Sequence, residues 1–302
     1  MGTDSLESGP SYVKSTLLTS SKYTNVTSGQ NVVVNKQGDD AVILTTSMGT
    51  RCTLTQTDIA FQGGLVHVVD NLLIPPARLP DTTEAFRIPS FLGGLWAADL
   101  MPEIAERKNV TIFAPQNEAL ELVGGSLDDM NEETLKKIMG YHIVPNKVLV
   151  SSALTNTTIL DTLTKDASLR IRVAGNNKYV NSAQIVQPDI LIANGILHII
   201  SNVLNPEAEA VTPDPDIGTQ PPVFPVSEAP DVFTSDLPCT TDCPTTTATS
   251  TPGEAAVTTT ASSSADLSTS SSEDAAGPSR PTPTFAAAAL GMLGLGAGMA
   301  FF

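Results

Sequence analysis

Residues 189–206 of this 302-residue chain read DILIANGILHIISNVLNP, and residues 58–75 read DIAFQGGLVHVVDNLLIP. The two stretches lie 131 residues apart without a gap, and Asp, Ile, Gly, His, Asn, Leu and Pro recur at equivalent positions. Most of the other apolar positions stay apolar in both copies. A match of this length is too long to arise by chance, so the chain contains an internal repeat.

The segments before these stretches also correspond. In the first copy, β-branched runs at 31–35 and 41–44 flank a Gly-Asp-Asp turn, and in the second copy runs at 169–173 and 178–180 flank Gly-Asn-Asn. Extended runs on either side of a Gly, Asn or Asp turn are typical of β-hairpins. Each copy is therefore expected to contain a hairpin ahead of the repeated stretch.

Only the second copy continues further towards the N-terminus. Residues 109–115 predict a short strand that the proline ends. Residues 116–122 predict a short helix, which we expect Gly124 and Gly125 to stop. This strand and helix have no equivalents in the first copy, which therefore resembles a back half alone.

A second helix is expected just beyond. Asp129 and Glu132 have the spacing of a capping box, which predicts a helix running through Met139 and ending at Gly140. A strand is expected to follow at 141–144.

The missing front half of the first copy creates a packing problem. The apolar strands at 32–34 and 42–44 would lack their packing partners, and exposed apolar patches of that kind invite aggregation. We expect one of two explanations. Either the natural chain begins upstream, with a secretory signal that residues 1–10 lack, or the half-module docks on the second copy.

Three blocks of the chain resemble the fasciclin (FAS1) domain family. They are TIFAPQNEA at 111–119, Tyr141-His142, and the stretch NGILHIISNVL at 194–204, which begins with Asn194 and Gly195. The resemblance implies an α+β fold, a β-sandwich or wedge with packed helices. It covers one complete module at 81–206 and a C-terminal half-module at 12–78. The family acts in cell adhesion and matrix contact, and fungal members are often GPI-anchored.

The resemblance also suggests an adhesion segment. Some animal members bind integrins through a Glu-Pro-Asp-Ile-Met segment, and the matching positions here read Gln-Pro-Asp-Ile-Leu at 187–191. The candidate binding residues are therefore Asp189 and Ile190, with Asp58 and Ile59 in the first copy. The structural alternative is that Asp189 caps a turn while Ile190 packs inward, and it is the favoured reading.

The three histidines all lie in the family's motifs. His67 and His198 stand among apolar strand residues, and His142 follows Tyr141, so each is expected to be a buried, hydrogen-bonded structural residue. None remains to activate a Ser or Cys nucleophile, and the chain has no metal, phosphate or dinucleotide motif. We predict no enzyme activity, no cofactor, no metal and no small-molecule substrate.

Net charge and composition bear on nucleic acid binding and on the C-terminal third of the chain. The formal net charge of −16 excludes the basic surface that nucleic acid binding requires. Residues 207–284 are acidic and rich in Pro, Ser and Thr, which predicts a disordered, O-glycosylated stalk. The alternative is an undecorated linker.

The C-terminus suggests a lipid anchor. Residues 285–302 form an apolar tail after a short polar spacer and small residues, the pattern of a GPI-attachment signal, with Ala275 as a candidate attachment residue. A transmembrane tail anchor is the alternative.

Modification sites agree with a secretory route. N-glycosylation sequons begin at Asn25, Asn109 and Asn156. Cys239 and Cys243 bracket a short turn and suggest a local disulfide, which leaves Cys52 without a partner.

Taken together, these features predict a cell-surface protein, held at the plasma membrane or in the wall through a GPI anchor. Its function is expected to be adhesion or wall and matrix organisation, through contacts with surface proteins, matrix proteins or wall glycans. The alternative is a structural wall glycoprotein, a scaffold or spacer without a specific partner.

Overall fold

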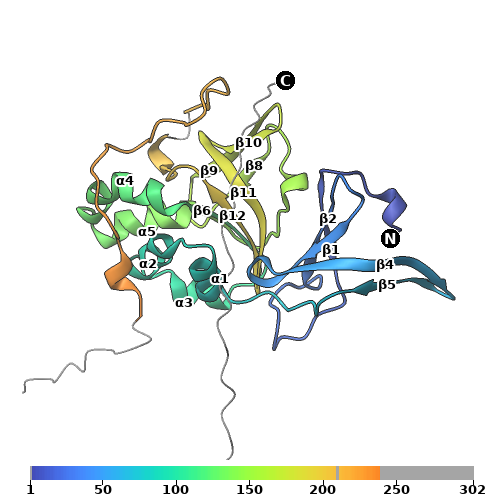
Figure 1. The fold of residues 1–302 in the computed structure, drawn as a ribbon. Helices are drawn as coiled ribbons and strands as arrows, with labels where there is room; N and C mark the ends of the chain where they lie inside the picture. The colour runs from blue at the N-terminus through green and yellow to red at the C-terminus, as the bar shows by residue number, and fades with distance from the viewer. Residues whose placement is uncertain (1, 209–210, 239–302) are drawn as a thin grey trace, which may run out of the picture. The chain divides into compact units, whose positions relative to one another are not determined.

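The computed structural model describes residues 2–208 and 211–238, which form two β-sheets and a layer of five helices (Figure 1). Cys239, Cys243, Ala275 and the apolar tail at 285–302 lie outside the described residues.

The first sheet is built from residues of the first repeat, in the order β1-β2-β3-β4-β5. Its strands are β1 (Ser11–Ser15), β2 (Asn31–Lys36), β3 (Val42–Thr45), β4 (Arg51–Phe61) and β5 (Gly64–Val69). All neighbours in this sheet are antiparallel. The hairpin expected at 31–35 and 41–44 is confirmed as β2–β3.

The second sheet has the order β7-β6-β12-β11-β10-β9-β8. Its strands are β6 (Val110–Pro115), β7 (Ile143–Val144), β8 (Ile159–Asp161), β9 (Ser168–Ala174), β10 (Asn177–Val180), β11 (Ala183–Ile192) and β12 (Gly195–Ile200). Strand β12 pairs in parallel with β6, and the other neighbours are antiparallel. The expected hairpin at 169–180 and the expected strand at 109–115 are confirmed.

The internal repeat is visible in the topology. The order β1 to β5 in the first sheet matches β8 to β12 in the second, and no counterpart of β6 or β7 occurs among the described residues of the first repeat. Hairpin β4–β5 has register shifts at Leu54/Gln56 and Gln56/Ile59. Hairpin β11–β12 has them at the same repeat positions, Ile185/Gln187 and Gln187/Ile190. Both copies therefore share the same bulges as well as the same residues.

The helices are α1 (Leu79–Ala85), α2 (Pro89–Ala97), α3 (Met101–Glu106), α4 (Asn117–Asp128) and α5 (Glu132–Tyr141). Proline stands in the first turn of α1, α2 and α3, where its missing N–H is not needed by the helix. Their apolar side chains bury one face of β6, β11 and β12 in the main core, with Phe91, Leu95, Ile112, Leu120 and Leu197 at its centre.

Two predicted helix boundaries are wrong. Helix α4 does not stop at Gly124-Gly125 but continues to Asp128, because both glycines face a close chain segment. A Cβ on Gly124 would lie 2.9 Å from the Ala229 Cβ, and one on Gly125 would collide with the Ser227 hydroxyl. The glycines therefore make room for a neighbour and do not end the helix.

The caps of α5 also differ from the prediction. Its N-cap is Asn131, whose side-chain oxygen accepts a hydrogen bond from the Thr134 N–H at 2.9 Å, so Asp129 and Glu132 form no capping box. The helix runs past Gly140 through Tyr141, which leaves only Ile143 and Val144 in the following strand.

The start of the expected stalk differs as well. Residues 223–237 pack on the helical layer, and Phe224, Val232 and Phe233 are buried in the main core. The N–H groups of Ser227 and Ala229 donate to the carbonyl oxygens of Leu122 (3.1 Å) and Glu121 (2.8 Å). A few apolar side chains among the prolines thus attach this segment to the module.

Candidate functional site

The predicted adhesion segment lies at the bulge of β11. Asp189 adopts a left-handed backbone (φ 61°), a conformation that Asp tolerates better than most residues. Its N–H donates to His198 Nδ1 at 3.2 Å, and His198 Nε2 lies 2.8 Å from the Leu149 carbonyl oxygen. Because Nδ1 accepts, Nε2 carries the proton and the ring is neutral, and burial lowers the pKa of His198 below its ordinary value.

The carboxylate of Asp189 points into the protein. Oδ1 accepts from the Ser151 N–H at 2.7 Å, and Oδ2 accepts from the Ser151 hydroxyl. Asp189 is 7% exposed and Ile190 is 5% exposed, with Ile190 in the main core. This geometry favours the structural reading of the segment, since both side chains are engaged within the module.

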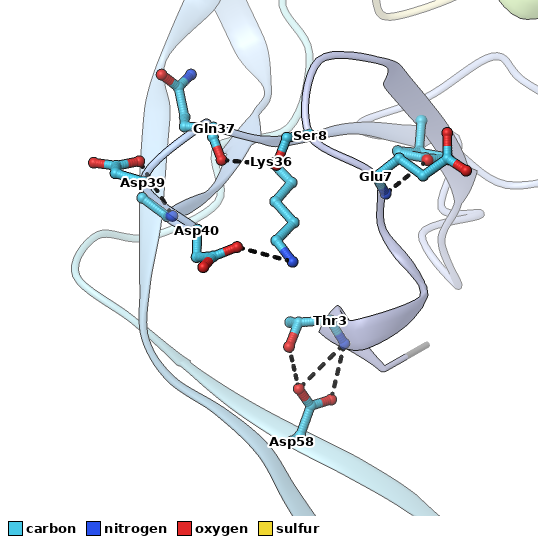
Figure 2. Close-up of polar contacts among 10 residues, drawn as sticks. Thr3, Glu7, Ser8, Lys36, Gln37, Asp39, Asp40 and Asp58 are labelled. Atoms are coloured by element: carbon cyan, nitrogen blue, oxygen red, sulfur yellow. Dashed lines mark hydrogen bonds and ion pairs between the residues drawn. The ribbon is translucent and has the colours of Figure 1, made fainter.

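The first copy repeats the polar half of this arrangement. Asp58 has φ 57°, its N–H donates to His67 Nδ1 at 3.2 Å, and its carboxylate accepts from the Thr3 N–H at 3.1 Å and from the Thr3 hydroxyl (Figure 2). The hydrogen bond from the Thr3 side chain is the main cause that lowers the pKa of Asp58. Ile59, by contrast, is 43% exposed, and His67, which was expected to be buried, is only half-buried because the described residues supply no helical layer to this hairpin.

Sequence reasoning missed the two hydroxyl partners. Thr3 and Ser151 stand 148 residues apart, whereas the repeated stretches stand 131 apart, so an ungapped comparison does not align them. A gapped search for a hydroxyl residue at the start of each half-module would have found both.

His142 and Tyr141 are buried polar links, as their positions suggested. His142 Nδ1 lies 2.8 Å from the Ile138 carbonyl oxygen, and Nε2 accepts from the Leu204 N–H at 2.9 Å, so the ring is a neutral Nδ1–H tautomer. Burial lowers the pKa of His142 to about 4. The Tyr141 hydroxyl donates to the Ser168 carbonyl oxygen and accepts from Asn181 Nδ2, both at 2.8 Å.

Asn194 and Gly195 join β12 to its surroundings. Asn194 Nδ2 donates to the carbonyl oxygens of Ile104 (2.8 Å) and Arg107 (3.1 Å), and so binds the C-terminal end of α3. Gly195 pairs with Val110 of β6, and a Cβ here would collide with the Val110 carbonyl oxygen. Glycine is therefore required for the parallel strand to approach.

The two repeats are in direct contact. The N–H of Asn25 donates to the Ala193 carbonyl oxygen at 2.8 Å, and Gln30 Nε2 donates to the Ile192 carbonyl oxygen at 3.1 Å. Val33 packs with Leu191 and Ile196, whose side chains alternate with those that face the helices. The first repeat thus docks on the second, which was one of the two explanations offered from the sequence.

The expectation that the strands at 32–34 and 42–44 lack packing partners is wrong. Val33, Val34 and Val42 are all buried. Val33 packs on the second repeat, and the other two belong to a small core with Leu6.

A cavity of about 690 Å³ lies where the repeats meet, and we name it the junction groove. Its walls are residues 21–25, 75–81 and 193–194, with parts of α2 and α3. Tyr23 and Trp96 contribute aromatic surface, 44% and 36% exposed. The place of Trp96 at the groove is a second feature that sequence reasoning missed. Clefts of this size at such a junction are typical ligand sites.

The sequons lie on the surface of the described residues. Asn156 is exposed, whereas Asn25 and Asn109 are partly buried near the junction of the repeats. Asn109 Nδ2 donates to the hydroxyl of Thr27 at 2.9 Å, which links the second sequon to the first.

Two kinds of feature are absent from the part of the chain that the structure describes. No cluster of three or more His, Cys, Asp or Glu side chains there is suited to a metal ion. None of the helices in residues 2–208 and 211–238 has the length and apolarity to span a bilayer.

Comparisons with known proteins agree with the motifs. Residues 87–206 match the family model "Fasciclin domain". A fasciclin-like arabinogalactan protein of Arthroderma benhamiae is 34% identical over 75% of this chain and 53% of its own length. Fasciclin-like arabinogalactan protein CTB11 of Cercospora beticola is 30% identical over 62% of this chain and 51% of its own. The chain spans about half the length of these curated relatives.

A solved FAS1 domain pair from the insect cell adhesion molecule fasciclin I is 20% identical. The match has a TM-score of 0.39 and covers 60% of this chain and 70% of that one. The match to the family model spans α2 to β12. Residues 87–206 of this chain are a fasciclin domain with the FAS1 fold.

Proposed function

We propose that this protein acts outside the cell, at its surface, in adhesion or in organising the wall and matrix, through contacts with proteins or glycans and without turnover. The observation that carries the proposal is the fasciclin domain at 87–206, together with the similarity to two fungal fasciclin-like arabinogalactan proteins.

The chemistry of the histidines supports a binding role. His142 and His198 are buried and hold backbone groups, and His67 accepts the N–H of Asp58. A general base needs a ring nitrogen within reach of a substrate proton, and these contacts occupy both ring nitrogens of His142 and His198 and Nδ1 of His67. We therefore assign all three histidines a structural role.

The junction groove is the proposed contact site. It offers two aromatic side chains, Tyr23 and Trp96, beside the polar groups of Lys22 and Asn25. A groove with aromatic and polar walls suits a sugar surface. The expected partner is a wall glycan or a glycosylated surface protein.

The groove is tested by binding of the secreted protein to isolated fungal wall fractions. Trp96→Ala is expected to weaken binding about tenfold, the effect of losing one buried aromatic anchor. The control is Ile159→Ala, which removes an exposed apolar side chain on β8, outside the groove. Equal binding by both variants and the parent would exclude the groove.

Surface attachment through a GPI anchor near Ala275 is the second part of the proposal, supported by the small residues, spacer and apolar tail at 274–302. The full chain is expressed with a signal peptide in a fungal host and treated with phosphatidylinositol-specific phospholipase C or wall glucanase. Release by either enzyme is expected. Retention against both, with extraction by detergent alone, would contradict the anchor and favour a transmembrane tail.

The alternative function is a structural wall glycoprotein that displays glycans without a specific partner. The three sequons and the Ser/Thr-rich 240–272 segment favour it. Saturable binding to wall fractions that Trp96→Ala lowers would favour a specific contact. Binding that does not saturate, unchanged in the variant, would favour the scaffold.

A further inference from the structure

Hairpin β4–β5 exposes an apolar surface that its copy in the second repeat buries. Five side chains of the first repeat are between 40% and 86% exposed, and we call them the bare face: Ile59, Phe61, Val66, Val68 and Leu72. Figure 1 shows β4 and β5 as a long two-stranded ribbon that extends beyond the rest of the first sheet.

The repeat supplies a template for this surface. The residues 131 positions later are each at most 6% exposed and all belong to the main core: Ile190, Ile192, Leu197, Ile199 and Val203. The helical layer and β6 cover them. The bare face therefore has the composition of a surface that packs under a helical layer, and the described residues supply no such layer to it.

A glycine gives a second, independent sign. Gly195 is required because the Val110 carbonyl oxygen of β6 lies against it. Gly64 occupies the same repeat position, but a Cβ there would meet only the Phe61 side chain, at 3.3 Å. Its φ does not fall in the left-handed region, so its own turn does not require glycine. The residue suits the approach of another backbone.

The outer edge of β5 supports the same conclusion. Strand β12 pairs with β11 on one side and β6 on the other, whereas within the described residues β5 pairs with β4 alone. The outer edge of β5 thus carries backbone groups open to strand addition.

We propose that the bare face and the edge of β5 dock a second fasciclin front half, a polypeptide with the pattern of residues 79–150. It would add one strand parallel to β5, with its backbone against Gly64, and lay apolar helices over the bare face.

This occupant is distinct from residues 79–150 of the same molecule, because those residues already cover β11–β12. A second folded copy of the chain has its own front half engaged in the same way. To fill the bare face, it would have to expose an equal apolar surface on its own β11–β12. The occupant is therefore a front half other than residues 79–150 of either copy.

A graft tests the proposal on the full chain. Residues 79–150 are duplicated and joined ahead of Thr3, because Thr3 and Ser151 hold equivalent positions against Asp58 and Asp189. Backbone amides of β5 are expected to exchange at least about tenfold more slowly than in the parent, and binding of an apolar dye is expected to fall. Unchanged β5 exchange in a folded graft would overturn the proposal.

The matched control carries Ile112→Asp in the duplicated segment only, where Ile112 would face the bare face. It is expected to restore parent-like exchange in β5. A graft that protects β5 equally with this charge would show a nonspecific effect and overturn the proposal.

A second measurement does not depend on folding of the graft. A synthetic peptide with the sequence of residues 108–117 is added to the full chain, and β5 exchange is followed. Slower exchange that Val66→Asp abolishes would support the proposal, and no change at millimolar peptide would oppose it. Protection of β5 in the untreated chain that rises with its concentration would identify a second copy as the occupant and overturn the assignment.

Discussion

Hairpins β4–β5 and β11–β12 carry the same Asp-Ile pair near the end of their first strands, share the same bulges and hold the same Asp–His contact. They differ in what covers them. Ile190 is 5% exposed beneath the helices, whereas its repeat partner Ile59 is 43% exposed. The difference teaches that the local pattern determines the strand, its bulge and the direction of its side chains. Burial depends on a layer that the sequence of the hairpin does not encode.

The same comparison separates two kinds of contact within the motif. The polar contacts of Asp58 are retained without the helical layer, because Thr3 comes from the half-module itself. The apolar contacts of Ile59 are not retained, since they depend on residues equivalent to 79–145. The effects of substitutions at two paired positions on the free energy of unfolding should therefore differ most where one of the two residues contacts the front half.

The largest divergence is expected at the paired glycines. Gly195→Ala places a methyl group against the Val110 carbonyl oxygen of β6, and we expect a loss above about 4 kcal/mol or failure to fold. Gly64→Ala meets only the flexible Phe61 ring, and a change below about 1 kcal/mol is expected. Urea unfolding of both variants measures the difference, and equal losses would break the comparison.

The paired isoleucines come next. Ile190→Ala leaves a cavity in the main core and should lower the free energy of unfolding by about 4 kcal/mol. Ile59→Ala removes a half-exposed side chain, with an expected loss below about 1 kcal/mol. A large loss at Ile59 would indicate that the bare face is covered in solution.

The front half also brings a pH dependence through His142. His142 binds a proton with an ordinary pKa of 6.5 when unfolded but only at about 4 when folded, so the unfolded state binds more protons between these values. Stability is therefore complete above about pH 6.5 and falls by roughly 3 kcal/mol as the pH drops to about 4.

Urea midpoints across this pH range measure the loss, and the NMR titration of His142 identifies its source. The burial of His198 acts in the same direction. A flat midpoint from pH 7 to pH 4.5, or a His142 signal that titrates near 6.5, would contradict the buried neutral ring.

Local sequence predicted the hairpins, β6 and the buried Tyr141-His142 pair, because alternation, turn residues and short motifs are local signals. Local sequence did not predict the features that depend on tertiary contacts. Gly124 and Gly125 stay helical because residues 227–232 pack against them, and a glycine pair alone does not reveal that neighbour.

The candidate site follows the same rule. The Asp–His contact at nine residues' separation is local and recurs, but the hydroxyl partners Thr3 and Ser151 come from 55 and 38 residues away. The junction groove joins segments of both repeats, so no single stretch of sequence contains it. The stretch at 211–238 is rich in proline, and only its buried Phe224, Val232 and Phe233 show that it packs on the module.

The smallest divergence is expected at the paired aspartates, where Asn keeps the left-handed backbone and removes the charge. Asp189→Asn weakens two partly buried hydrogen bonds from Ser151, with an expected loss of about 1 kcal/mol. Asp58→Asn should change stability less, since Asp58 is half-buried whereas Asp189 is buried. Binding to wall fractions, measured on the same variants, separates structure from adhesion. If Asp189 has a structural role, Asp189→Asn lowers stability and leaves the affinity for wall fractions unchanged. Lost affinity at unchanged stability would instead support an adhesion role for the segment at 187–191.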